Sequence, residues 1–319
     1  MYSDLLICDW TLRVMRIAAR RSGVAVTVAV VATISRAVLV TGCSRGIGRA
    51  IASRLVAADW VVYATARRPD DLATLAAEGC RTLALDVTDE ASRRAAVAAV
   101  VDAEGAVGVL VNNAGFSQSG PVEVVAPADA RRQFDTNFFG PARLTQLVLP
   151  GMRAQGWGKI VNISSMGGRV TFPGGGYYHA TKYALEALSD ALRFEVAGFG
   201  VDVVLVEPGF VRTGFSEAAA ATMGDPATTG GDDPYRDFTA GLLRSTRDVY
   251  RRGFLSKLAG DADDVARVVL RAICVERPKA RYPVTPSARV LRALRVGLPD
   301  RAWDRLMAGS FSAPGPPRG

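Results

Sequence analysis

Two side chains one helical turn apart suggest acid–base chemistry. Tyr178 and Lys182 are four residues apart, and positions i and i+4 share one face of a helix. An ammonium beside a phenol favours the phenolate, so the pair predicts that the pKa of Tyr178 falls from about 10 toward neutrality. Such a phenol exchanges a proton at working pH. Ser165 follows an apolar run, Lys159 to Ile163, that predicts a strand, and its hydroxyl can bond the oxygen that the tyrosine protonates.

The tyrosine–lysine pair alone is a weak signal. With eight tyrosines and four lysines in the chain, chance places a lysine four residues after some tyrosine about one time in ten. Tyr177 is excluded because Thr181 occupies its +4 position. The pair therefore gains weight only if the chain also supplies a nucleotide site.

A glycine-rich turn near residue 42 supplies that site. The run 37–40 predicts a buried strand, and a helix with apolar residues four apart follows the turn. Gly42 permits a tight turn, Gly46 lets the backbone approach a pyrophosphate, and Gly48 lets the helix pack on the strand. An ordinary glycine-rich turn is the alternative, but the order strand, turn, helix favours a dinucleotide site.

The end of the second expected strand, 60–65, indicates which dinucleotide binds. An acidic residue there would bind the adenosine ribose of NAD, but this strand is followed by Ala66 and Arg67. Arg67, and Arg45 within the turn, present the planar fork of donors that suits a 2′-phosphate. The sequence thus predicts NADP in preference to NAD, with merely exposed arginines as the alternative.

The rest of the chain alternates strands with helices. Strands are expected at 82–85, 109–111, 159–163, 202–206 and 281–284, and helices at 89–103, 127–149, 178–192 and 263–275. This alternation predicts an α/β fold: a doubly wound parallel sheet (Rossmann fold) of about seven strands with helices on both faces. Residues 210–255 have a loose pattern and follow the sixth strand, which favours a lid over the ligand edge.

The two ends of the chain carry its basic charge. The net charge is +8, and residues 277–319 contain nine basic and two acidic side chains. We interpret residues 1–35 as a poorly ordered extension, because the apolar run 24–34 is too short to span a bilayer; a membrane-associating anchor is the alternative. Residues 36–285 form the expected domain, and 286–319 a basic helix with a disordered tail.

The expected helix 287–298 is amphipathic. Its arginines fall on one side, and Val290, Leu291 and Leu294 fall on another. We favour packing of this apolar side on the domain or the substrate entrance over contact with a membrane surface. A solvated, arginine-rich composition explains the basic ends better than nucleic-acid binding, because no aromatic side chains alternate with the arginines.

The four cysteines show no CxxC spacing and the only histidine is His179. No metal site is expected from this pattern, and it fits a reducing, cytoplasmic compartment.

Taken together, the motifs resemble the short-chain dehydrogenase/reductase family over about residues 36–285. The resemblance rests on Thr41 to Gly48, Asp86, Asn112-Asn113-Ala114-Gly115, Asn137, Ser165, Tyr178, Lys182 and Pro208-Gly209, in the order and spacing of the family. The pattern TGxxxGIG is similar to that of the single-domain branch.

The resemblance implies a role for each matching residue. Tyr178 would be the acid in reduction and the base in oxidation, Lys182 would lower its pKa and hold the nicotinamide ribose, and Ser165 would orient the carbonyl. Asn137 would hold a water that links Lys182 to solvent. The cofactor would contact Thr41, Gly42, Ser44, Arg45, Gly46, Ile47, Gly48, Arg67, Asp86, Val87, Asn113, Ala114, Gly115, Pro208, Gly209 and Thr213. His179 is interpreted as a bystander, with substrate contact as the alternative.

For the substrate, the sequence predicts only a chemical class. The segment 277–282 and the basic tail resemble retinol and 17β-hydroxysteroid dehydrogenase-like members. Five apolar residues are expected near the cleft mouth and favour a lipophilic ketone or secondary alcohol: Phe116, Met166, Phe172, Phe210 and Phe215. A non-catalytic NADP-binding scaffold is the competing function. The resemblance also implies a homodimer or homotetramer, formed through the helices that carry Asn137 and Tyr178.

Overall fold

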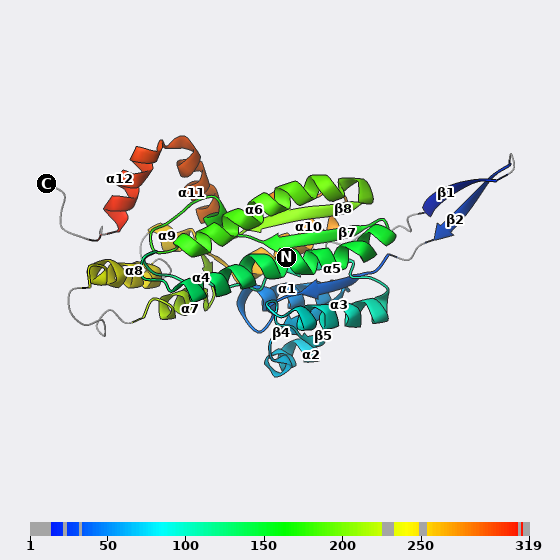
Figure 1. The fold of residues 1–319 in the computed structure, drawn as a ribbon, viewed down its shortest axis with the longest axis horizontal. Helices are drawn as coiled ribbons and strands as arrows, with labels where there is room; N and C mark the ends of the chain where they lie inside the picture. The colour runs from blue at the N-terminus through cyan, green and yellow to red at the C-terminus, as the bar shows by residue number, and fades with distance from the viewer. Residues whose placement is uncertain are drawn as a thin grey trace, which may run out of the picture.

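One parallel sheet dominates the molecule. The computed structural model describes residues 14–21, 24–31, 34–224, 233–248, 254–311 and 314. Its seven-stranded sheet has the order β11-β8-β7-β6-β3-β4-β5 (Figure 1). The strands are β3 (Ala37–Val40), β4 (Val61–Ala66), β5 (Arg81–Ala84), β6 (Val109–Asn112), β7 (Gly158–Ile163), β8 (Val201–Glu207) and β11 (Arg281–Pro283). All neighbouring pairs are parallel, so the predicted doubly wound sheet is confirmed.

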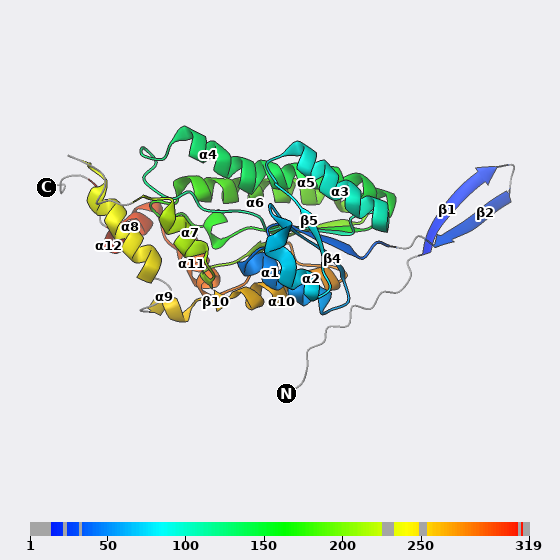
Figure 2. The same cartoon turned by 90° about the horizontal axis from the view of Figure 1, so that it is seen from below.

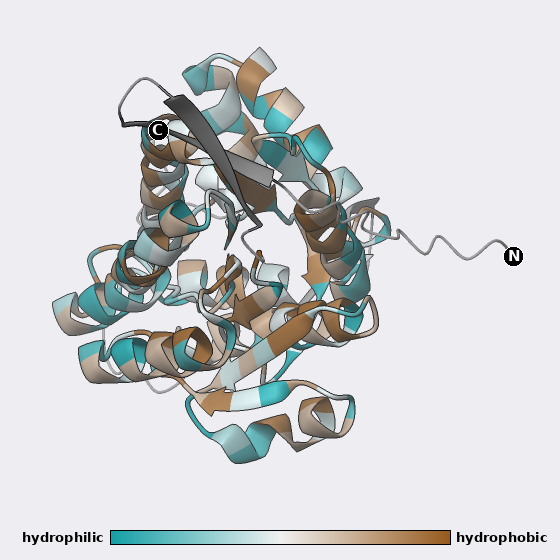
Figure 3. Cartoon of the chain, turned by 90° about the vertical axis from the view of Figure 1, so that its right-hand side faces the viewer, coloured by the Kyte–Doolittle hydropathy of each residue, from teal (hydrophilic) through white to brown (hydrophobic). Residues whose placement is uncertain are grey.

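Helices cover both faces of this sheet, as Figure 2 shows. One layer contains α1 (Gly46–Val56), α2 (Ala73–Ala77) and α10 (Ala262–Cys274); the other contains α3 (Glu90–Glu104), α5 (Gly140–Ala154) and α6 (Gly176–Val196). Successive strand residues point to opposite faces: Val38 and Val40 join the core beneath α1 and α10, while Leu39 joins the core beneath α5. Figure 3 shows the hydrophobic strands enclosed between helices whose outer sides are more polar.

The strands point toward the end of the molecule that holds the remaining elements (Figure 1). Those elements are β9 (Val211–Arg212), α7 (Phe215–Ala221), α8 (Arg236–Asp248), α9 (Phe254–Lys257), β10 (Gly260–Asp261), α11 (Pro286–Gly297) and α12 (Asp300–Ser310). The chain winds from β3 outward in both directions, so β3 and β6 mark the switch point at which a crevice opens beyond the strand ends.

The expected helix 127–149 is interrupted. It consists of α4 (Pro127–Phe134), a π-helical turn (Asp135–Phe139) and α5. In the π turn the Gly140 N–H donates to the Asp135 carbonyl, five residues back, and Pro141 has no N–H to give to the carbonyl of Asn137. Such turns often mark functional sites, and this one carries Asn137.

The two ends of the chain add further elements. Strands β1 (Val14–Arg21) and β2 (Val24–Val31) form an antiparallel pair, and the poorly ordered extension expected for residues 1–35 stays a prediction. Valine-rich segments favour extended strands. Helix α12 was not expected; it begins after Pro299, which starts a helix readily. The expected disordered tail lies, apart from residue 314, outside the described residues. Among the described residues, no helix is both long and apolar enough to cross a membrane.

A core substitution tests the packing beneath α5. Leu144 is fully buried, so Leu144→Ala leaves a cavity that lowers the free energy of unfolding by about 2–5 kcal/mol. Leu306→Ala, at a position 41% exposed on α12, changes it by about 0.5 kcal/mol or less. Chemical denaturation of both variants measures the difference, and equal losses would contradict the packing.

Candidate active site

A cleft of about 1210 Å³ lies at the end of the sheet where the strands point. Its walls come from the glycine turn, the ends of β4 and β6 to β8, the helix α6, and α7 and α8. It brings together Ser165, Tyr178 and Lys182 and every predicted cofactor residue except Thr41. Thr41 and Asn137 do not line it. The residues selected from sequence thus converge on one cavity.

The glycine turn is held from behind by β6. The Thr41 hydroxyl accepts the backbone N–H groups of Asn113 and Ala114, each at 2.9 Å. The Asn113 amide donates to the carbonyls of Thr41 (2.8 Å) and Gly42 (3.1 Å). A Cβ on Gly48 would lie 2.4 Å from that amide nitrogen. Thr41 and the Asn113 side chain therefore shape the turn, and Gly48 is required because the Gly42 carbonyl, 2.3 Å from that Cβ, and the Asn113 amide fill the space.

The turn ends at the N-terminus of α1, which is suited to an anion. No side chain caps this end of the helix, so its first N–H groups and the positive end of its dipole face the cleft. A Cβ on Gly46 would meet only Thr213, at 3.6 Å, although the positive φ of 61° favours glycine. These residues fit the diphosphate of a dinucleotide.

Two arginines border the same part of the cleft. Arg45 and Arg67 are exposed and line it, and neither forms an ion pair with another described residue. Arg68, in contrast, pairs with Asp71 at 2.8 Å. The pKa of Asp86 is lowered: burial opposes the shift, but hydrogen bonds from Thr88 and the charge of Arg67 outweigh it. The cleft thus has two free guanidinium groups beside one ionised carboxylate.

The predicted catalytic groups meet where β7 ends and α6 begins. The Ser165 side chain lies beside the phenol of Tyr178 and offsets part of the rise in its pKa that burial causes. Lys182 Nζ lies 5.9 Å from the Tyr178 ring centroid and donates to the Ile163 carbonyl at 2.8 Å. Ser165 Oγ also accepts the Gly167 N–H at 2.9 Å, so the hydroxyl that faces the phenol is fixed in place.

The pKa of the tyrosine differs from the expectation. Burial raises the pKa of Tyr178 to about 12, and the Ser165 side chain lowers it less than burial raises it. Burial likewise lowers the pKa of Lys182 to about 8, which the nearby Glu186 carboxylate partly opposes. The predicted fall toward neutrality is wrong for the protein groups alone, because loss of hydration favours the neutral form of each group. At neutral pH Tyr178 carries its proton.

Asn137 lies behind the catalytic groups. Its amide donates to the Phe116 carbonyl (2.8 Å) and to the Thr181 hydroxyl (3.2 Å), and its oxygen accepts the Phe116 N–H (3.1 Å). The π turn therefore connects the loop after β6 to α6, one residue before Lys182. The structure thus shows a bridging position for Asn137, whereas a water-holding role stays a prediction.

The His179 ring connects two loops through hydrogen bonds. Its Nδ1 lies 2.9 Å from the Gly167 carbonyl, and its Nε2 accepts the Phe172 N–H at 3.2 Å. These partners require the neutral ring with the proton on Nδ1. Burial lowers its pKa accordingly. Cβ atoms on Gly167 or Gly175 would lie 2.6 Å from the ring, which explains both glycines and gives His179 a structural role.

Sequence reasoning missed the support of the loop after β8. The Gly209 N–H donates to Thr285 Oγ1 (3.1 Å), and the Phe210 N–H donates to Ser287 Oγ (2.9 Å). Both hydroxyls are buried, and Thr285 also caps α11. The helix-start pattern Thr285-Pro286-Ser287 marked a cap, but nothing in sequence linked it to residues 209–210.

The five predicted apolar residues all line the cleft, namely Phe116, Met166, Phe172, Phe210 and Phe215. Residues of the 210–255 segment add Ala218, Met223 and Leu242, which sequence reasoning had not selected. One side of the cleft is therefore polar and suited to a nucleotide, and the other is largely hydrocarbon.

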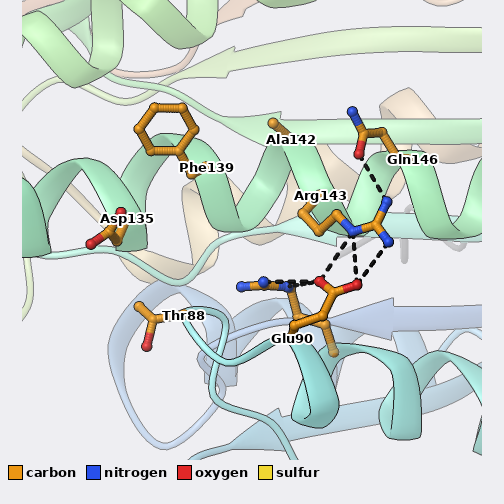
Figure 4. Close-up of a pocket in the computed structure, with 8 residues that line it drawn as sticks. Thr88, Glu90, Asp135, Phe139, Ala142, Arg143 and Gln146 are labelled. Carbon is orange, nitrogen blue, oxygen red and sulfur yellow. Dashed lines mark hydrogen bonds and ion pairs between the residues drawn. The ribbon is translucent and has the colours of Figure 1, made fainter.

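A second cavity, of about 330 Å³, lies between α3 and α5 (Figure 4). The Glu90 carboxylate in it accepts hydrogen bonds from Arg143, the shortest at 2.7 Å, and from Arg93 at 3.0 Å. These bonds, Arg143 first, lower the pKa of Glu90 to about 2. The charge of Glu90 is satisfied by arginines of α3 and α5, so this ion-pair cluster links the two helices.

Known proteins are similar to this chain in sequence. A family model described as short chain dehydrogenase matches residues 36–224. A 3-ketodihydrosphingosine reductase of Bacteroides thetaiotaomicron is 35% identical over 256 residues, which cover 80% of this chain and 90% of that protein. An NADPH-dependent 3-dehydrocapnine reductase of Ornithobacterium rhinotracheale is 34% identical over 280 residues, 85% of this chain and 95% of that protein.

Solved structures are also similar to this chain. A short-chain dehydrogenase from Streptomyces avermitilis is 36% identical, has a TM-score of 0.69, and covers 86% of this chain and 98% of its own. A serine dehydrogenase complexed with NADP+ is 30% identical, has a TM-score of 0.67, and covers 78% and 94%. The cleft geometry and these likenesses support use of a nicotinamide cofactor for redox chemistry on CH–OH groups. We conclude that the chain belongs to the short-chain dehydrogenase/reductase family.

Proposed function

We propose that this protein is an NADPH-dependent reductase of lipophilic ketones, with Tyr178 as the general acid. The observation that carries this proposal is the placement of Ser165, Tyr178 and Lys182 in one cleft, between an anion-binding turn and an apolar wall. A non-catalytic scaffold would have no need of all three groups at the point where the two halves of the cleft meet.

The protein groups have complementary tasks in this reaction. Bound NADPH would supply a hydride from its nicotinamide ring. The Ser165 hydroxyl would orient the carbonyl oxygen toward the phenol of Tyr178, whose raised pKa keeps the proton in place until the oxygen gains negative charge. Lys182, fixed on the Ile163 carbonyl, would bring positive charge near the phenolate that remains.

The cofactor preference rests on Arg45 and Arg67. Both line the cleft without an ion-pair partner among the described residues, and a 2′-phosphate would satisfy both. The relative named an NADPH-dependent reductase and the NADP+ complex of the serine dehydrogenase support the same choice.

The substrate class rests on the apolar side of the cleft. A wall of phenylalanine, methionine and leucine side chains binds hydrocarbon and leaves the polar groups to fix the reacting end. The relative named a 3-ketodihydrosphingosine reductase acts on a keto compound, which supports a ketone substrate here.

The domain, assembly and location assignments are part of the same proposal. Residues 36–285 would form the catalytic domain, with 210–255 as its lid. Phe139 in the π turn and Tyr183 and Phe194 on α6 are 56%, 43% and 89% exposed, which supports a homodimer or homotetramer through these helices. A cytoplasmic location would supply NADPH.

Removal of the phenolic hydroxyl tests the acid role. Tyr178→Phe should lower kcat for ketone reduction at least about a hundredfold, the scale of lost acid catalysis, while NADPH binding persists. Tyr177→Phe removes the neighbouring hydroxyl and should retain activity. NADPH oxidation followed by absorbance, with a panel of ketones, measures both. Equal activity of the two variants would contradict the assignment of Tyr178 as the general acid.

Removal of the free arginines tests the cofactor choice. Arg67→Ala should raise the KM for NADPH at least about tenfold, the scale of one lost charge-assisted hydrogen bond, and leave the KM for NADH unchanged. Arg68→Ala is the matched control, because Arg68 already pairs with Asp71. If NADPH and NADH weaken together in Arg67→Ala, the 2′-phosphate assignment is wrong.

The pKa of Lys182 predicts a pH dependence of stability. Its folded pKa of about 8 lies below its ordinary value of 10.5, so between these values the unfolded chain binds more protons and stability rises with pH. The opposite effect of Tyr178, with a pKa raised from 10.0 to about 12, begins only above pH 10.0. Lys182→Met should remove a rise of up to about 1.4 kcal/mol per pH unit between pH 8 and 10.

Denaturant unfolding at several pH values measures this rise. The exposed Lys279 provides the control variant Lys279→Met, which should keep it. Identical pH profiles for wild type and Lys182→Met would show that the lysine is not desolvated.

A further inference from the structure

Helix α11 is apolar on the side that faces solvent as well as on the side that faces the domain. Ser287, Ala288 and Leu291 are buried, as expected for its apolar side. The expectation that Val290 and Leu294 pack with Leu291 is wrong: they are 39% and 42% exposed. The exposed arc consists of Arg289, Val290, Ala293, Leu294, Val296 and Gly297. An exposed apolar arc of this kind marks a surface that another molecule can cover.

This helix packs behind residues that line the cleft. Ala288 and Leu291 pack with Met166, and Phe172 and Phe210 pack against them. The buried Trp303 of α12 lies with its ring centroid 6.4 Å from that of Phe172. Figure 1 places α11 and α12 at the end of the molecule that holds α8. The exposed apolar arc is thus one helix thickness from the hydrocarbon side of the cleft.

Unpaired positive charge accompanies the apolar arc. Arg289, Arg301 and Arg305 on α11 and α12 are exposed, and none forms an ion pair with another described residue. Arg292 and Arg295 are engaged, with Glu207 and Asp300. Helices α11 and α12 therefore carry exposed valine and leucine side chains, three guanidinium groups outside ion pairs and one exposed carboxylate, Asp304, so their unpaired charge is net positive.

The exposed apolar arc and the unpaired arginines together favour one binding partner. A second copy across a two-fold axis would bring the same arginines together, and nucleic acid would place phosphates against valine and leucine. An anionic lipid surface accepts both features, because hydrocarbon side chains enter the headgroup boundary while arginines contact the lipid charges. We propose that the exposed arc of α11 and the arginines of α11 and α12 dock on an anionic bilayer and hold the cleft mouth at its surface.

Flotation with lipid vesicles tests this docking surface. The full chain should float with vesicles of phosphatidylcholine mixed with phosphatidylglycerol, less with vesicles of phosphatidylcholine alone, and less as salt increases. Replacement of Arg289, Arg301 and Arg305 by alanine should lower the partition about a hundredfold, about fivefold for each charge. The double variant Leu294→Glu/Val296→Glu should lose binding, whereas Val101→Glu, 38% exposed on α3, should bind as wild type does.

Three outcomes would overturn the proposal: absence of flotation at low salt, equal flotation with neutral vesicles, or a double variant that still floats but sediments as a smaller species. The last outcome would indicate that the exposed arc of α11 binds a second copy of this chain. Reduction of a water-soluble ketone should be unchanged in the double variant and in the arginine variant. If the proposed enzymatic function is wrong, the wild-type protein will not reduce the ketone but will still bind vesicles. The two proposals can therefore fail independently, and the experiment distinguishes them.

Discussion

Loss of hydration around Tyr178 and Lys182 is the constraint on which this site depends. Burial raises the pKa of the phenol and lowers that of the ammonium, so both groups favour their neutral forms. Charge can exist here only where a partner holds it. Ser165 lies beside the phenol and the Ile163 carbonyl accepts the lysine. A proton that leaves Tyr178 therefore needs a developing negative charge close by to receive it.

The sheet provides those partners because its parallel strands end together. Ser165 follows β7, the Asn113 bridge follows β6, and the loop at Gly209 follows β8. Side-chain hydrogen bonds between neighbouring strand ends align them. The Asn112 and Asn162 amides continue this pattern deeper in the sheet with a bond of 2.9 Å. The polar side of the cleft is thus formed at the ends of the strands, whereas α7 and α8 add apolar residues.

Much of this arrangement was predictable from sequence. Strands of a buried parallel sheet are short apolar runs, and each expected strand was found within about two residues, a usual margin. The positions of Asp86, the glycine turn and Asn113 could be predicted because each lies directly after an expected strand. The sequence order of the motifs was therefore enough to place them at one edge.

What sequence could not provide depended on contacts between distant residues. The pKa of Tyr178 was predicted from the neighbouring Lys182 alone, and burial by the rest of the fold reversed its direction. The hydroxyls of Thr285 and Ser287 reach a loop some 76 residues earlier in the chain.

The bridge from Asn113 to the glycine turn has a consequence for how such a protein can change. Two carbonyls and the packing of Gly48 depend on this single amide, so the diphosphate cradle tolerates little alteration. Arg45 and Arg67 stand outside it, in solvent. Evolution can therefore exchange one dinucleotide for another at the rim while the inherited scaffold beneath stays the same.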